Sequence, residues 1–170
     1  MTRFDEVRAT FWGEDPYGDP PPLTDAAVRD AERRLGVRLP ASLLELLRDR
    51  NGGVVADAWD ACPTDGPTSW SEDHVPFDRL SGVVEEDGDH LSVLDSPCLV
   101  EEWGLPSPLV LLSGDGHAWI ALDYRACGAD GEPSVTWFDA DDASELPLAG
   151  DFRTFVEGLR ASASFHDGQD

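Results

Sequence analysis

Asp115, His117 and Asp123 are the residues whose side chains come closest to forming a chemical site. Carboxylate and imidazole groups that lie together can bind zinc or transfer protons. The stretch 117–124 alternates like a strand, which puts His117 and Asp123 on one face but roughly 20 Å apart. One ion cannot reach both, so we expect Asp115 to support a turn, His117 to be packed or exposed, and no metal or cofactor to bind.

Nucleophilic catalysis needs a Ser or Cys beside a His and an orienting acid. The histidines at positions 74, 90, 117 and 166 lie in expected loops or at expected ends, without a recognisable nucleophile elbow. The glycines at 114–116 and 128–131 are typical of turns between strands, with no helix after them to hold a phosphate. We therefore expect a protein that is not an enzyme; a hydrolase built on Asp115, His117 and Asp123 is the most distant alternative.

Aromatic and acidic residues suggest a binding surface instead. Trp119 and Asp123 fall on one strand face with Trp137 nearby, and Trp is enriched at binding hot spots. A core role for these tryptophans is the alternative. The acidic runs 85–87 and 139–142 are either solvated loops or parts of a docking surface. The candidate partner-binding residues are Asp115, His117, Trp119, Asp123, Trp137, Asp139, Asp141 and Asp142.

The elements that would position these residues form a three-stranded antiparallel meander. Turn residues at 114–116 and 128–133 separate short runs with the pattern of strands. The expected strands are 108–113, 117–124 and 134–139. The alternation in the second strand also predicts that Ile120 and Leu122 are buried against helices at 24–35 and 152–160.

Helical spacing of apolar residues recurs on both sides of this meander. Thr2 and Thr24 suit N-cap positions, and Gly36 suits a helix end. The expected helices are 2–12, 24–35, one that starts at Leu39-Pro40, 96–104, and one that starts at Asp151. Short strands are expected near 54–55 and at 80–84, with a long loop between them that contains Trp59 and Trp70. The fold class is therefore α+β, a mostly antiparallel twisted sheet with an N-terminal helix pair and a C-terminal helix packed against it.

Composition indicates one folded domain with an unusual charge. The chain has 170 residues and is 41% hydrophobic with six Trp, which is too apolar for a disordered acidic chain. Twelve Arg and no Lys against 35 carboxylates give a net charge of -23. Such a field repels phosphate and anionic headgroups, so nucleic acid and membranes are excluded as partners and a basic protein is favoured. A role of the charge in solubility alone is the alternative.

Cysteine usage and hydropathy indicate the compartment. Cys62, Cys98 and Cys127 are odd in number and widely spaced, which fits neither a disulfide framework nor a zinc knuckle. The N-terminus is charged, and no apolar run approaches the ~18 residues of a membrane helix. We therefore expect a cytoplasmic protein with reduced thiols, no signal peptide and no membrane span.

Residues 23–53 resemble the N-terminal signature of the SUKH superfamily. They read LTDAAVRDAERRLGVRLPASLLELLRDRNGG, a capped helix with Glu before Leu-Gly, then Leu-Pro, a second helix and Asn-Gly-Gly. The later runs GDGHAWIALDYR, GEPSVTWFD and DFRTFVEGL look like the central hairpin and closing helix of bacterial members. The resemblance spans 23–160, which leaves 1–22 as a helix with a Pro/Gly-rich tether and 161–170 as a polar tail. One departure is Ser42-Leu43-Leu44, where the family usually has a Tyr soon after its Leu-Pro.

The resemblance implies a binding scaffold without a common catalytic residue set. Its best-known members are bacterial immunity proteins that neutralise polymorphic toxins, often nucleases or deaminases, and fungal regulators of cell-wall assembly. We therefore expect an acidic immunity or antitoxin protein whose partner is a basic protein, a nuclease- or deaminase-type toxin. The alternative is a regulatory or scaffold module that binds an endogenous cellular protein.

Overall fold

The computed structural model describes residues 2–14, 20–68, 70–84, 92–114 and 117–165. The helices are α1 (Arg3–Ala9), α2 (Asp25–Leu35), α3 (Ala41–Asp49), α4 (Ser96–Trp103) and α5 (Phe152–Glu157), with 3₁₀ turns η1 (Val93–Asp95) and η2 (Ser162–Phe165). The strands are β1 (Gly53–Val54), β2 (Ala61–Pro63), β3 (His74–Pro76), β4 (Arg79–Leu80), β5 (Leu109–Gly114), β6 (Ala118–Asp123), β7 (Ser134–Asp139) and β8 (Ser144–Ala149). The expected α+β class is confirmed.

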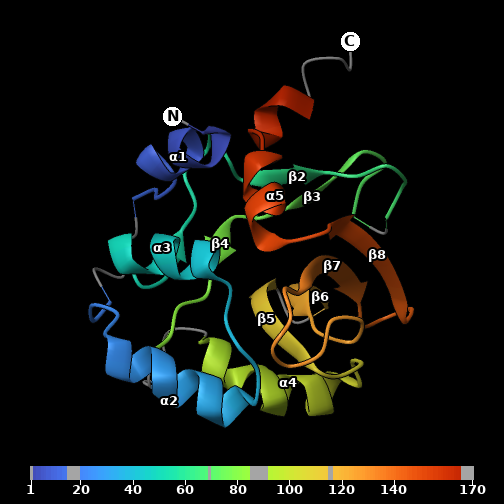
Figure 1. The fold of residues 1–170 in the computed structure, drawn as a ribbon. Coiled ribbons are helices and arrows are strands. Elements are labelled where there is room, and N and C mark those ends of the chain that lie inside the picture. The colour runs from blue at the N-terminus through green and yellow to red at the C-terminus, as the bar shows by residue number, and fades with distance from the viewer. Residues whose placement is uncertain (1, 15–19, 69, 85–91, 115–116, 166–170) are drawn as a thin grey trace.

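The main sheet is an antiparallel meander in the order β5-β6-β7-β8 (Figure 1). The three expected strands are present, and β8 adds a fourth that the sequence analysis did not predict. The alternating Leu146 and Leu148 in β8 could have revealed it, but Pro147 lies between them. Because β8 pairs only with β7 among the described strands, it is an edge strand, where a proline is tolerated.

Two short ladders lie beside the main sheet. β1 pairs with β4, close to the two short strands expected near 54–55 and 80–84. β2 pairs with β3 inside the stretch expected to be one long loop, so that expectation is wrong in part. Each of these strands has three residues and ends in a proline, and ten residues separate them. Neither the length nor the turn gives the usual signal of a hairpin.

The helix ends follow the capping residues that the sequence predicted. The hydroxyls of Thr2 and Thr24 accept backbone N–H groups in the first turns of α1 and α2. Gly36 ends α2 with a φ of 71°, a left-handed conformation that glycine adopts without strain. Asp151 caps α5 in the same way as the threonines, through the Thr154 N–H.

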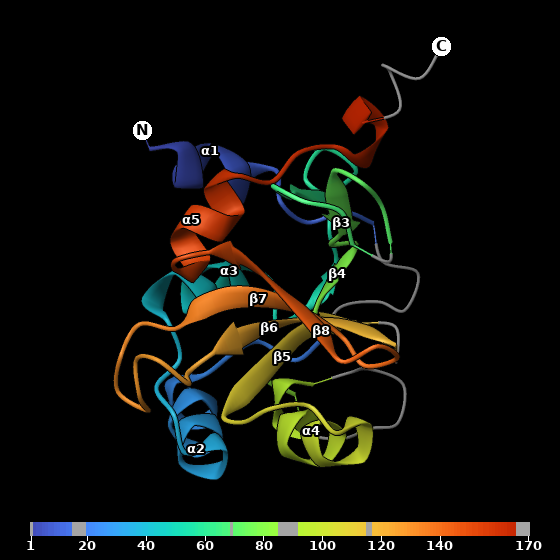
Figure 2. The same cartoon turned by 90° about the vertical axis from the view of Figure 1, so that its right-hand side faces the viewer.

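The sheet is covered on both faces, with α5 above it and α4 below it (Figure 2). The larger core, on the α5 side, also receives α1, α2 and α3. Ile120 and Leu122 lie in this core and are 2% and 0% exposed, which confirms the prediction that these two side chains are buried on the α5 side. On the opposite face, α4 covers a smaller cluster that contains Trp119 and Phe138. Because β6 is covered on both faces, apolar side chains point to both sides of the sheet.

The Asn-Gly-Gly motif at 51–53 joins α3 to β1 in a tight space. Gly52 has a φ of 100°, and a Cβ there would lie 2.6 Å from the Gly82 nitrogen. The Asn51 amide is buried and bonds both the N–H and the carbonyl of Val83, each at 2.8 Å. The motif thereby fixes the position of the segment after β4.

No helix of the described residues is long and apolar enough to cross a membrane.

Candidate functional site

Trp119 and Trp137 do not form the shared patch that the sequence analysis considered. Antiparallel partners share a sheet face, and the register pairs Trp119 with Phe138 and Trp137 with Ile120. The two indoles therefore lie on opposite faces, and each is 3% exposed. Both tryptophans are therefore core residues, the alternative that the sequence analysis left open. Each one packs beneath the helices that cover its own face of the sheet.

Asp123 shares the face of Trp119, as expected, but it is bound within the protein. The Arg125 guanidinium donates to both of its oxygens, at 3.0 and 2.8 Å, and also to Glu145 at 3.0 Å. Partial burial acts to raise the pKa of Asp123, but the hydrogen bonds from Arg125 and Thr136 outweigh it, and the pKa lies below its usual range. Asp123 is thus a buried half of an ion pair.

The acidic turn after β7 contains one buried and two exposed aspartates. Asp139 is 6% exposed, and its Oδ1 accepts the Asp141 N–H at 2.9 Å, so the expectation that it is solvated is wrong. Asp139 thus closes the turn through the backbone N–H of Asp141. Asp141 and Asp142 are exposed, and His117 Nδ1 lies 3.3 Å from Asp141 Oδ1.

The acid–base set of the most distant alternative is not brought together among the described residues. His117 lies just before the start of β6 and Asp123 at its end, and Asp115 is outside the described residues. No group of three His, Cys, Asp or Glu side chains that could hold a metal occurs in the part of the chain that the structure describes. The acidic run 85–87 is likewise outside the described residues.

A cleft of about 660 Å³ lies between the β2–β3 hairpin and the end of the sheet where β5 leads to β6. The hairpin side contributes Trp70, Ser71, His74, Asp78 and Arg79, and the residues before β2 and after α5 contribute Asp60 and Ser162. The sheet side contributes Trp119 and Trp137, among others. Trp70 is 57% exposed, in contrast to every other large apolar side chain of the described residues. The cleft combines aromatic and acidic side chains. The sequence analysis expected this combination on the strand face that carries Trp119 and Asp123.

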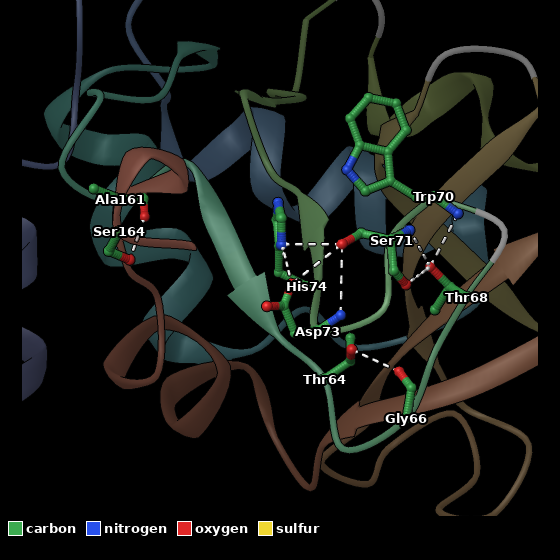
Figure 3. Close-up of polar contacts among 9 residues, drawn as sticks. All are labelled: Thr64, Gly66, Thr68, Trp70, Ser71, Asp73, His74, Ala161 and Ser164. Atoms are coloured by element: carbon green, nitrogen blue, oxygen red, sulfur yellow. Dashed lines mark hydrogen bonds and ion pairs between the residues drawn. The ribbon is translucent and has the colours of Figure 1, made fainter. Parts of the chain in front are cut away.

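Ser71 and His74 line this cleft. Figure 3 shows that Asp73 lies beside them, in hydrogen-bond contact with both. His74 Nδ1 lies 2.7 Å from Asp73 Oδ1 and 3.3 Å from Ser71 Oγ. In a hydrolytic triad the acid and the nucleophile bond opposite ring nitrogens, so that a proton can cross the ring. Here both partners address the same nitrogen, and this trio is not arranged as a triad.

The trio instead joins three residues of the segment that follows Trp70. The hydrogen bond to His74 holds the pKa of Asp73 below its usual range. The His74 ring is 7% exposed and stacks on Phe165 at 4.2 Å between ring centroids. Thr68 Oγ1 accepts the N–H groups of Trp70 and Ser71, and in Figure 3 the Trp70 ring extends away from this bonded group. The Trp70 backbone is therefore hydrogen-bonded while its side chain is exposed.

Sequence reasoning missed the cleft because its walls come from distant segments. Asp60, Asp78 and Ser162 have no common motif or period in the sequence. One local signal was present in the sequence. Trp70 is a large aromatic residue in a stretch rich in Thr, Ser, Asp and Pro, where no apolar pattern places it in the core.

Comparison with known proteins adds the family. The model of the SMI1 / KNR4 family (SUKH-1) matches residues 22–158. The match begins in the segment that leads into α2 and ends just after α5. It therefore includes both sides of the cleft except Ser162. No curated protein matches the chain.

Proposed function

This chain belongs to the SMI1 / KNR4 family (SUKH-1), and from that premise we propose that it is an immunity protein that binds a basic toxin domain and covers its active site. The family includes immunity proteins and regulators, and its members generally bind protein partners. A protein-binding role thus comes from the family. The toxin-neutralising role and the basic character of the partner are the proposal.

The observation that carries the proposal is the net charge of -23. Exposed carboxylates lie in several loops of the described residues: Asp57, Asp65, Glu72, Asp78, Asp141 and Asp142. A field of one sign attracts an oppositely charged protein and can raise its association rate far above that of a neutral pair. Nucleases bind polyanions and carry basic substrate surfaces, so an acidic protein is complementary to the surface it has to block.

A second function, regulation of an endogenous protein, is favoured by the same family match. The two functions differ in the partner, since a toxin domain is lethal to the cell without its immunity protein and an endogenous partner is not. Under both proposals the protein works in the cytoplasm and is not an enzyme. The arrangement of Ser71, Asp73 and His74 on one ring nitrogen supports the absence of a hydrolytic centre at the cleft.

The deciding experiment first asks whether a toxin domain is encoded beside this gene and then expresses that domain with and without this protein. We expect co-expression of this protein to restore the growth of cells that express the toxin domain, and the two chains to co-purify as one complex. Growth arrest that persists at equal expression, with no complex in purification, would contradict the immunity role. A stable complex with an endogenous protein in the same purification would favour regulation.

A further inference from the structure

The β2–β3 hairpin is too small to be stable without further support. Each strand has three residues, and among the named strands of the described residues the two pair only with each other. A two-stranded hairpin is marginally stable in water, and a further strand or a packed apolar face is needed to hold it. Cys62 and Val75 join the larger core and give part of this support. A second part comes from the C-terminal segment.

Residues 160–165, which we call the C-terminal strap, lie along the hairpin. Arg160 and Ala61 exchange two backbone hydrogen bonds, both at 2.9 Å, so Arg160 takes the place of a third strand beside β2. The two carboxylate oxygens of Asp60 accept the N–H and the hydroxyl of Ser162, at 2.7 and 3.2 Å. The strap is therefore bonded to the start of β2 through both backbone and side chains.

The other end of the strap is held by an aromatic contact. The Phe165 ring stacks on the His74 ring of β3, with 4.2 Å between the ring centroids and 15° between the planes. Between the two ends, the Ser164 hydroxyl donates to the Ala161 carbonyl at 2.6 Å, inside the turn that the strap forms (Figure 3). The strap thus contacts both strands of the hairpin. It begins just beyond residue 158, where the family match ends.

The hairpin and the strap also form one wall of the cleft. His74 and Pro76 of the hairpin and Ser162 of the strap line this wall, and Trp119 and Trp137 of the main sheet line the cleft as well. Among the described strands, no ladder joins β2 or β3 to the main sheet. The hairpin can therefore move without breaking the pairing of β5, β6, β7 and β8.

We propose that the C-terminal strap holds the β2–β3 hairpin closed, and that release of the strap lets the hairpin open as a unit and widen the cleft while the main sheet stays folded. Proteins open in cooperative local units that cost less free energy than global unfolding. A partner that binds the open form better would shift the population toward it. The proposal goes beyond the proposed function and does not depend on it, because it concerns a motion of this chain alone.

Cys62 is a native reporter of this opening. It lies in β2 and is 4% exposed, and burial raises the pKa of its thiol to about 12. Thiol reagents react with an accessible thiolate, so Cys62 reacts when the hairpin opens. Cys98 and Cys127 are exposed, and the substitutions Cys98→Ser and Cys127→Ser leave Cys62 as the single thiol of the full-length chain. The rate of its reaction with an aromatic disulfide reagent then measures the population of the open hairpin.

The dependence of this rate on urea separates local from global opening. Global unfolding exposes a large surface and responds steeply to urea, whereas the opening of one hairpin exposes little. We expect the labelling rate of Cys62 to change little at low urea and to rise steeply only near the unfolding transition. This measurement needs no substitution in the strap.

Substitutions in the contacts of the strap test its role. Phe165→Ala removes the ring stack and should raise the labelling rate at low urea roughly two- to tenfold. Asp60→Ala removes both bonds to Ser162 and should raise the rate as well. Trp103→Ala is the matched control, because Trp103 is a half-buried aromatic residue of α4 whose ring meets the His117 ring at 6.0 Å. It should leave the rate at low urea unchanged.

Three outcomes would overturn the inference. A labelling rate that follows urea as steeply as global unfolding at every concentration would mean that the hairpin opens only with the whole chain. Unchanged rates in both Phe165→Ala and Asp60→Ala would mean that the strap does not hold the hairpin. Equal acceleration by Phe165→Ala and Trp103→Ala would assign the effect to a general loss of stability.

Discussion

At the scale of single residues, Asn51 connects three segments of the chain. Its amide donates to the carbonyls of Val83 and Pro21, at 2.8 and 3.1 Å, and accepts the Val83 N–H. Asn51→Ala leaves buried backbone groups without partners, so we expect the free energy of unfolding to fall by about 2–4 kcal/mol. Urea denaturation measures the loss. A midpoint equal to that of the wild type would mean that water replaces the amide.

A second prediction for a single residue concerns the contribution of the Asp123 carboxylate to stability. A carboxyl whose pKa is lowered on folding contributes stability that is present above its unfolded pKa of about 3.9 and lost as the pH falls through the folded pKa. We expect Asp123→Asn to cost about 1–3 kcal/mol at pH 7, and the difference from wild type to shrink below about pH 4. Urea midpoints at pH 7 and pH 3 measure this, with the exposed Asp141→Asn as control. A difference that does not change with pH would assign the effect to packing.

At the scale of elements, α3 and α5 are fixed by the apolar side chains that they bury. Leu47 and Phe155 are 0% and 1% exposed in the larger core. We expect Leu47→Ala or Phe155→Ala to cost ~2–5 kcal/mol, because each truncation leaves a cavity. Leu44→Ala, on the same helix as Leu47 but half-buried, is the control with a smaller expected loss. Denaturant midpoints equal to wild type for both test variants would remove them from the core.

At the scale of the whole molecule, the charge of -23 acts on association. If it steers a basic toxin domain, the association rate should fall steeply as salt reduces the Debye length to ~8 Å and below, while dissociation changes much less. Asp141→Asn with Asp142→Asn should mimic salt without unfolding the protein. Asp139 stays unchanged because its carboxylate closes the turn. Stopped-flow mixing with the toxin domain measures both rates.

A contact residue should behave in the opposite way. Truncation of an anchoring side chain raises the dissociation rate and leaves long-range attraction unchanged. Trp70→Ala is therefore the matched comparison in the same experiment. Association that is insensitive to salt would contradict steering and assign the charge to solubility.

The sequence by itself determined the helices, the strands β5, β6 and β7 and the family, while it did not predict β2, β3 or β8. Capping threonines, Gly36, the alternation at 117–124 and the apolar spacing of the helices are local signals, because each depends on residues within one or two turns or along one strand. The order of these signals also identified the family that the comparison confirmed. Net charge is a sum over the chain, and no fold is needed to obtain it.

Only the tertiary structure decided what each functional residue faces. Trp119 and Trp137 carry the same local signal, yet the register places them on opposite faces. Asp139 and Asp141 are neighbours in one acidic run, yet one is buried and the other exposed. The cleft joins Asp60, Trp70 and Trp119, which only packing of the β2–β3 hairpin against the sheet brings together. Register and packing depend on contacts between distant segments, and such contacts leave no period in the sequence from which they could be predicted.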